Sequence, residues 1–536
     1  MALGLSILTF GPAVGFGLVW DDTALYDSPL DPARAADWLR AFTLELGDAR
    51  LDTEEGPTGY YRPLVVCSFL LDRAIGGVEG AASVGHLQSI GWQLLAVLAL
   101  SRVLGRLRFG PAAAALALVV FALHPLQVEP TVWLSARNDL MVSVFVLGAL
   151  GLALPAGGPA FGLGRALAVF GLGLAGALSK ELGLIAPLVL LIAGAPPRAL
   201  LASALGVGAA AALRGAVGAQ ALGFSAAQVW AVLPATAAIS ARDLLWPVGL
   251  HPGERLGWSP AAPLGPLWAG LGLGAALLAA GRGRARTGLL LAGLAWAPSL
   301  AAVSQLGLVG LRYHHLCLAG LGIAIGAAAD RWAPERAARA LVVGLGLLGL
   351  VQSQRALLGW TDDGAFWEAA VARHPNPYTW TGRAHHRRSV GELEGAAADL
   401  KRATTGPDLS PMACFGVASL ALRRGMPAEA AAEGLRALQA GCAPSPELLA
   451  PTAVGLVATG RWSEAQPLID AVHVDPTGMA VVVRVALEAR VRQRAAWDGA
   501  GAPSGLAEQS AYLLEQGGDL ESAAWLRAAA RVGPPG

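Results

Sequence analysis

The stretch that decides the fold is Phe121-Ala-Leu-His124-Pro125-Leu-Gln-Val-Glu129-Pro-Thr-Val-Trp133-Leu-Ser-Ala-Arg137-Asn138-Asp139, a polar segment within a very apolar region. Apolar runs at 109–123 and 138–154 flank it. A membrane-spanning helix needs roughly 20 such residues, with a working range of about 17–25. Because polar groups are costly inside lipid, the abrupt change on either side predicts two membrane spans joined by a polar loop.

The composition of the whole chain also indicates a membrane protein. Of 536 residues, 54% are apolar and only 14% are charged, whereas a soluble domain carries about 25% charge. These values exclude a single water-exposed core and a long disordered tail, which needs the opposite bias. The net charge of +1 offers no concentrated basic face, so we expect no nucleic-acid partner. We predict an all-α, polytopic transmembrane protein.

Further apolar runs extend the predicted bundle to about eleven spans. The first run ends at Trp20-Asp21-Asp22 without a small-residue cleavage site, so we expect a retained helix and not a signal peptide. The segment 226–246 is interrupted by Arg242-Asp243 and is predicted to be an interfacial helix. The predicted spans are 3–20, 84–104, 109–123, 138–154, 161–178, 182–195, 198–213, 264–280, 287–303, 313–329 and 338–353.

The placement of arginine predicts the orientation. With a cytoplasmic N-terminus, the inner loops would hold many arginines against only Asp330 and Glu335, which is the positive-inside pattern. An alternative is that an Arg-rich genome places arginine in any loop, but the first outer loop, 21–83, is rich in acids and favours the assigned direction. The inner arginines are Arg102, Arg106, Arg108, Arg165, Arg198, Arg282, Arg284, Arg286, Arg331, Arg336 and Arg339.

This orientation places the loop 124–137, Lys180, the segment 214–263 and everything after about 354 on the outer face. Lys180 and Lys401 are the only lysines, and the chain has 69 glycines, a bias typical of a GC-rich bacterial genome. We therefore predict a multi-pass protein of the bacterial inner membrane with its C-terminal part in the periplasm.

A second periodicity begins after the last predicted span. A small residue, a glycine and a Glu-Ala pair recur with a spacing of roughly 34 residues, which is typical of tetratricopeptide repeats. The glycines are Gly391, Gly425 and Gly460, and the Glu-Ala pairs begin at Glu429 and Glu464. We predict a membrane domain at 1–355 and a repeat domain at 356–536, a stacked α-solenoid. Either the repeats bind a peptide or they pack on the membrane domain.

The acid pair at the end of the first span is a candidate catalytic group. Asp21 and Asp22 could act as a general base or hold a divalent cation. The alternative is that these acids only mark the non-cytoplasmic boundary.

The polar segment after Pro125 supplies a second group. If it is helical, Glu129, Trp133 and Arg137 share one face through the i, i+4 spacing. A carboxylate, an aromatic ring and a guanidinium suit a sugar that carries a phosphate. The alternative is a salt bridge between Glu129 and Arg137 alone.

Three other motifs place polar residues at outer helix ends. Lys180 stands between two apolar runs, and pairing with Glu181 is the structural alternative to a binding role. Two adjacent histidines follow Arg312-Tyr313, but they diverge on a helix and make a poor metal pair, so the arginine and tyrosine are the more informative residues. Tyr61-Arg62 opens a short helix predicted to lie flat on the outer surface, and His86 opens the second span.

In this order the motifs resemble the polytopic inverting glycosyltransferases of the GT-C class. They are most similar to the transmembrane and tetratricopeptide repeat-containing O-mannosyltransferases and their bacterial relatives. The resemblance covers nearly the whole chain, and the stretch from His124 to Asp139 is its most specific part. The sequence departs from the family pattern at Ser89, near which an Asn is expected, and at Leu311, where an acid is usual.

The resemblance implies transfer of a sugar, mannose or another hexose, from a polyprenyl-phosphate donor in the membrane to a protein or glycolipid acceptor. An acid of the first outer loop would be the catalytic carboxylate: Asp22, or else Asp21, with Glu129 orienting the acceptor or a cation. Cations aimed at the leaving phosphate would lower the barrier; the candidates are Arg137, Lys180 and Arg312, with Arg62 and His124 as weaker ones. The candidate substrate-binding residues are Trp133, Tyr61, Tyr313, His86 and Asp139. The cation cluster could take the place of a metal ion.

Two other functions compete with this hypothesis. One is a non-catalytic, membrane-anchored scaffold that acts through its repeats. The other is a transporter of lipid-linked substrates, which would normally show polar residues at mid-membrane depth. Within the repeats, Cys414 and Cys442 either form a disulfide on an oxidising outer face or remain thiols.

Overall fold

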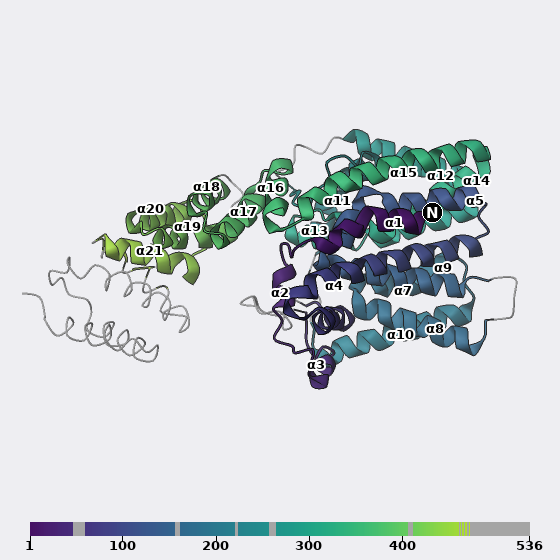
Figure 1. Cartoon of the computed structure of the whole chain (residues 1–536), viewed down its shortest axis with the longest axis horizontal. Helices are drawn as coiled ribbons and strands as arrows, with labels where there is room; N and C mark the ends of the chain where they lie inside the picture. Colours follow the sequence, from purple (N-terminus) through teal and green to yellow (C-terminus); the bar gives the residue numbers. More distant parts are fainter. Residues whose placement is uncertain are drawn as a thin grey trace, which may run out of the picture. The chain divides into compact units, whose positions relative to one another are not determined.

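The computed structural model describes residues 1–46, 59–155, 161–219, 223, 225–256, 264–405 and 411–459, and scattered positions from 461 to 471. Within these ranges the regular structure is helical (Figure 1), apart from one isolated bridge between Arg255 and Leu308. The all-α prediction is confirmed. The chain forms two compact units that divide between His374 and Pro375.

The first unit is a bundle of helices joined by short irregular or 3-10 segments. Its elements in chain order are α1 (Ala2–Phe10), η1 (Gly11–Gly15), α2 (Asp22–Tyr26), α3 (Ala35–Arg40), α4 (Pro63–Arg106), α5 (Pro111–Leu123), η2 (Pro125–Gln127), α6 (Val128–Val132), η3 (Leu134–Ala136), α7 (Arg137–Ala153), α8 (Leu163–Ser179), η4 (Glu181–Ile185), α9 (Ala186–Ile192), α10 (Pro197–Val217), α11 (Ala226–Leu245), α12 (Leu264–Trp296), α13 (Ser299–Leu306), η5 (Leu311–His314), α14 (His315–Trp332), α15 (Glu335–Leu357), η6 (Leu358–Trp360) and α16 (Asp363–Arg373).

Several of these helices could cross a membrane. Among the described residues, five helical stretches are long and apolar enough, and a sixth arises if Pro111–Leu123 and Pro125–Val132, bent by 50°, form one span. Shorter apolar helices occur at Ala2–Gly15, Leu163–Ser179 and Glu181–Ile192. The count of eleven spans stays a prediction. The five are Pro63–Arg106, Leu134–Ala153, Pro197–Val217, Gly283–Leu306 and Glu335–Trp360.

Three predicted spans differ from the structure. The first, 3–20, ends as a helix at Gly15, and Pro12 accompanies its change to 3-10 geometry because proline lacks the N–H that continues an α-helix. The predicted spans 264–280 and 287–303 have an arginine-rich inner loop between them in the prediction, but in the structure α12 continues as a helix through that segment. No proline interrupts that segment, and its three arginines and one alanine favour helix, although its two glycines do not.

The helices of the bundle pack closely at small residues. Helices α12 and α14 form the most extensive pair, and a Cβ on Gly320 would lie 2.5 Å from the backbone of Gly288 and of Ala292. Such approach is typical of membrane helices, which associate through small residues. Helix α4, by contrast, is bent at Gly77, whose φ of 63° lies in the left-handed region that glycine tolerates.

Two of the arginines predicted for the inner face bind groups at one set of helix ends. Arg165 donates hydrogen bonds to the carbonyls of Leu152 and Leu154. Arg284 pairs with Asp330 at 2.8 Å. The polar motifs lie at the other ends of the same helices: where α8 ends, and where α7 and α14 begin. The bundle therefore separates the two groups of charges.

The second unit begins with α17 (Pro377–Ser389), α18 (Leu393–Ala403), α19 (Pro411–Arg423), α20 (Pro427–Gln439) and α21 (Pro446–Ala458). Neighbouring helices pack in sequence, and the turns after α17 and α19 contain Gly391 and Gly425 at φ 85° and 73°. Cys414 and Cys442 form a disulfide, so the bonded alternative is the one observed. The tetratricopeptide assignment stays a prediction, and Gly460 lies outside the described residues.

The predicted domain boundary after residue 355 falls inside α15. The unit extends further because α16 belongs to it: the ring of Phe366 lies 5.5 Å from that of Trp20, which follows the first helix.

Candidate active site

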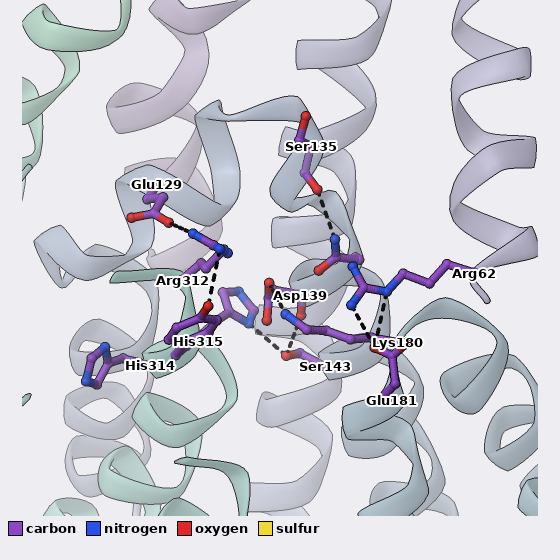
Figure 2. A network of polar contacts seen from close by, with 12 residues as sticks. Arg62, Glu129, Ser135, Asp139, Ser143, Lys180, Glu181, Arg312, His314 and His315 are labelled. Carbon is purple, nitrogen blue, oxygen red and sulfur yellow. Dashed lines mark hydrogen bonds and ion pairs between the residues drawn. The ribbon is translucent and has the colours of Figure 1, made fainter. Parts of the chain in front are cut away.

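Three ion pairs form a polar network at one end of the bundle (Figure 2). Arg312 contacts Glu129 at 2.6 Å, Lys180 contacts Asp139 at 2.5 Å, and Arg62 contacts Glu181 at 2.7 Å. In Figure 2 the Lys180–Asp139 pair lies between the other two pairs. These six side chains come from five separate helix ends or connections, so the fold brings together residues that are distant in sequence.

Local backbone geometry explains why these positions converge. Arg62 is the N-cap of α4, and Asp139 lies in the first turn of α7. Lys180 is extended (φ −161°, ψ 149°) where α8 ends, and Arg312 lies in the 3-10 turn before α14. Helix ends leave backbone groups unpaired, so they are where a membrane bundle accommodates charged side chains at least cost.

The three cations of this network are partly exposed, and two of the three carboxylates, those of Glu129 and Asp139, lie beneath them, whereas the side chain of Glu181 is 34% exposed. The side chains of Arg62, Lys180 and Arg312 are 11%, 13% and 18% exposed, whereas those of Glu129 and Asp139 are 0% and 3% exposed. Arg214 from α10 joins the network by pairing with Glu181 at 3.5 Å. Among these described residues, four cations stand against three carboxylates, so the network carries an excess of positive charge.

The pKa of Lys180 is shifted first by burial and further by these neighbouring cations. Burial lowers the pKa of the Lys180 ammonium, and although Asp139 opposes the shift, Arg62 and Arg312 add to it. An additional anion bound here would relieve the repulsion among the three cations.

Aromatic rings border the network. The guanidinium of Arg312 lies 4.8 Å from the ring centres of both Trp133 and Tyr313. Trp133 stacks on Trp20 at 4.3 Å and is only 4% exposed. Its predicted role as a sugar-stacking platform therefore requires this stack to open.

Asp22 reaches the same region through Ser135. One oxygen of the Asp22 carboxylate accepts hydrogen bonds from the Ser135 backbone N–H at 2.8 Å and from its hydroxyl at 2.7 Å. The other accepts from the backbone N–H of Val19 at 3.3 Å. The residue is fully buried, and burial raises the pKa of its carboxyl to about 7 against the opposing effect of these hydrogen bonds. Such a pKa suits a general base near neutral pH.

The predicted cation site at Asp21 and Asp22 gains no further ligands from the described part of the chain. Within it, no group of three or more His, Cys, Asp or Glu side chains is placed to hold a metal ion. The donors of Ser135 and Val19 occupy the Asp22 carboxylate instead.

Arg137 lies in a separate, fully buried cluster. It pairs with Asp72 at 2.7 Å and donates to the carbonyl of Gly85 at 2.9 Å and to the hydroxyl of Tyr26 at 3.4 Å. The prediction that Arg137 shares a helical face with Glu129 is wrong, because the helix breaks at Trp133 (ψ 113°) and α7 begins only at Arg137. In place of the alternative pairs Glu129–Arg137 and Lys180–Glu181, the structure pairs Glu129 with Arg312 and Lys180 with Asp139.

Three other predicted residues lie outside the network. His86 faces the carbonyl of Gly17 at 3.4 Å, and His124 faces the carbonyl of Leu244 at 3.2 Å. The hydroxyl of Tyr61 donates to the carbonyl of Phe42 at 2.9 Å. Each of these contacts joins two segments of the first unit.

Sequence reasoning missed several members of the site. Asp72 carried a usable signal, because it follows an apolar run in α4, where an acid is costly in a membrane helix. Ser135 carried none, since a serine in a loop is ordinary. His315 extends the network inward: its Nδ1 lies 2.8 Å from the hydroxyl of Ser143, and its Nε2 lies 2.8 Å from the amide oxygen of Gln93.

Comparison with known proteins gives a partial similarity. No family model matches the chain. A stretch of 144 residues, 27% of the chain, is 31% identical to a Drosophila melanogaster protein named "Protein O-mannosyl-transferase Tmtc2". The matched stretch spans only 15% of that relative. Together with the apolar helices, this distant similarity fits a membrane glycosyltransferase.

Proposed function

We propose that the chain is an inverting membrane glycosyltransferase that moves a sugar from a polyprenyl-phosphate donor to a hydroxyl of a protein or lipid acceptor. The acceptor oxygen forms a bond to C1 of the sugar while the bond from C1 to the phosphate oxygen breaks. The acceptor proton passes to a carboxylate, and the electron pair leaves with the polyprenyl phosphate. The reaction needs no oxidant or reductant.

The observation that carries this proposal is a cluster of partly exposed cations that outnumber the carboxylates paired with them. Lys180 and Arg312, supported by Arg62, would bind the donor phosphate and stabilise the charge it gains as the sugar leaves. These side chains lie at the ends of apolar helices, where a lipid phosphate would also lie. Arginine suits this role because its planar guanidinium matches phosphate oxygens.

Asp22 is the proposed base, and Arg137 has a positioning role in this scheme. Asp22 opens α2, and Tyr26 at the other end of that helix contacts both Asp72 and Arg137. The buried cluster therefore holds the helix that carries the base, while Ser135 orients the carboxylate directly.

The proposed compartment is the periplasm of a bacterium. The disulfide between Cys414 and Cys442 supports an oxidising location for the second unit, and the arginines at the opposite helix ends support a cytoplasmic position for those ends. In this arrangement the repeats would dock the acceptor.

The test is a transfer assay with the purified chain in lipid nanodiscs. Radiolabelled mannosyl or glucosyl polyprenyl phosphate is supplied with envelope proteins or glycolipids from the source organism, and the product is identified by mass spectrometry. Transfer that disappears in Lys180→Ala and Arg312→Ala supports the proposal. Cells with and without the gene that show identical envelope glycans contradict it.

A second candidate function is the non-catalytic scaffold. It is favoured by one observation, the complete burial of Asp22. It predicts that substitution of Lys180 leaves the protein's cellular role unchanged.

A further inference from the structure

The segment that carries Asp22 is held on two sides. On one side, Ser135 binds the carboxylate. On the other, the backbone N–H of Gly17 donates to the carbonyl of Thr361 at 2.9 Å, and the backbone N–H of Trp20 donates to Asp363 at 2.9 Å. Thr361 lies in the turn just before α16, and Asp363 is the first residue of α16, the last helix before the second unit.

The ring of Trp20 strengthens the same attachment. It lies between Trp133, at 4.3 Å, and Phe366, at 5.5 Å, and both neighbours are stacked on it. Trp367 adds an edge contact at 6.2 Å. A continuous column of rings therefore joins the cation network, where Arg312 lies over Trp133, to α16.

The backbone of Trp20 needs to be held in place. Its φ is 55°, in the left-handed region that a bulky residue rarely adopts. Such strain persists only when the surroundings over-determine it, and it is common at functional sites. Since Asp22 follows two residues later, relaxation of Trp20 would shift the carboxylate away from Ser135.

We propose that α16 is a clamp over the base, in which Asp363 holds the backbone of Trp20 and Phe366 holds its ring, and that these two positioning residues thereby keep Asp22 buried. Release of this clamp opens Asp22 to an acceptor hydroxyl. The catalytic part of this inference rests on the function proposed above, whereas the control of access to Asp22 does not.

The test measures that access without turnover. The full chain in detergent is treated with a water-soluble carbodiimide and an amine, and modification of Asp22 is followed by peptide mass spectrometry. The rate is normalised to Glu335, whose side chain is 62% exposed. In Asp363→Ala we expect modification to be about tenfold faster, the change that loss of one hydrogen bond to a charged group makes in an opening equilibrium.

Matched variants separate positioning from general damage. Asp363→Asn keeps an oxygen that can accept from Trp20 and should label at close to the wild-type rate. Asp362→Asn changes the neighbouring carboxylate but keeps the cap on Ala365, and should also match wild type. Phe366→Leu keeps an apolar side chain but removes the ring, so it should label faster even if Asp363→Ala does not fold.

Equal labelling of Asp22 in wild type, Asp363→Ala and Phe366→Leu would overturn the clamp. Fast labelling in Asp363→Asn would overturn the role of the hydrogen bond to Trp20. If labelling rises as expected but the wild-type chain transfers no sugar in the assay above, the clamp stands and the proposed transferase function fails.

Discussion

Arg137 and Asp72 form an ion pair at 2.7 Å in which both side chains are completely buried. The pair joins α7 to α4, and Tyr26 adds α2 through its 2.7 Å hydrogen bond to Asp72. The residue expected to bind phosphate therefore sits where no ligand reaches it in this state. Its effect on function would be exerted through the position of α2.

Arg137→Met should destabilise the protein strongly. Removing one partner of a buried ion pair leaves the other charge uncompensated, at a cost of about 3–5 kcal/mol. The free energy of unfolding in mixed detergent micelles measures this. The control is Arg339→Ala, an exposed pair with Glu335 on α15, which should change stability by about 0.5 kcal/mol or less. Equal stability of Arg137→Met and Arg339→Ala would show that the Arg137–Asp72 pair has no structural role.

Substitution of the partly exposed cations should lower transfer without unfolding the chain. For Lys180→Ala and Arg312→Ala we expect losses in kcat of about 10²–10³-fold, the effect of removing one preorganised donor. Arg284→Ala is the matched control, because it breaks an ion pair with Asp330, which lies at the opposite end of α14 from the network. A loss of activity in Arg284→Ala as large as in Lys180→Ala would count against a phosphate-binding role for Lys180.

Asp22→Asn should abolish transfer and remove a pH dependence. Because burial raises the pKa of the wild-type carboxyl to about 7, the ionised base forms, and kcat rises, as the pH increases through about 7. Asp27→Asn, at the exposed end of α2, should leave this profile unchanged. A pH profile for Asp22→Asn with the same rise would exclude Asp22 as the base.

The same carboxyl should affect stability in the opposite direction. The folded state binds the Asp22 proton more tightly than the unfolded state, so this group favours folding most at low pH, and its contribution is lost as the pH rises from about 4 to about 7. Wild type should therefore lose stability relative to Asp22→Asn over this range. Thermal unfolding of both proteins at several pH values measures the difference, and parallel curves would contradict the raised pKa.

Much of the architecture could be predicted from the distribution of apolar residues. The run at 109–123 closely matches α5, and the cost of charge in lipid correctly placed Lys180 and Arg312 at helix ends. The pairing of charges could not be predicted. Glu129 binds Arg312 because the helix breaks at Trp133, and in that break the N–H of Ser135 binds Asp22, 113 residues away. Spacing along the chain holds no information about such a contact.

The disulfide in the second unit gives a prediction independent of catalysis. Cys414 and Cys442 have Cα atoms 6.0 Å apart and are separated by 28 residues. Closing a loop of this length stabilises a fold by about 3–4 kcal/mol in the chain-entropy treatment. A reductant should therefore lower the unfolding temperature of the second unit in the full-length protein, and should have no such effect on the Cys414→Ser/Cys442→Ser variant.

Cys67→Ser, which removes a cysteine that forms no disulfide, is the control and should respond to reductant as wild type does. If both cysteines of protein isolated from cells react with iodoacetamide before reduction, the second unit does not reside in an oxidising compartment, and the periplasmic orientation must be reversed.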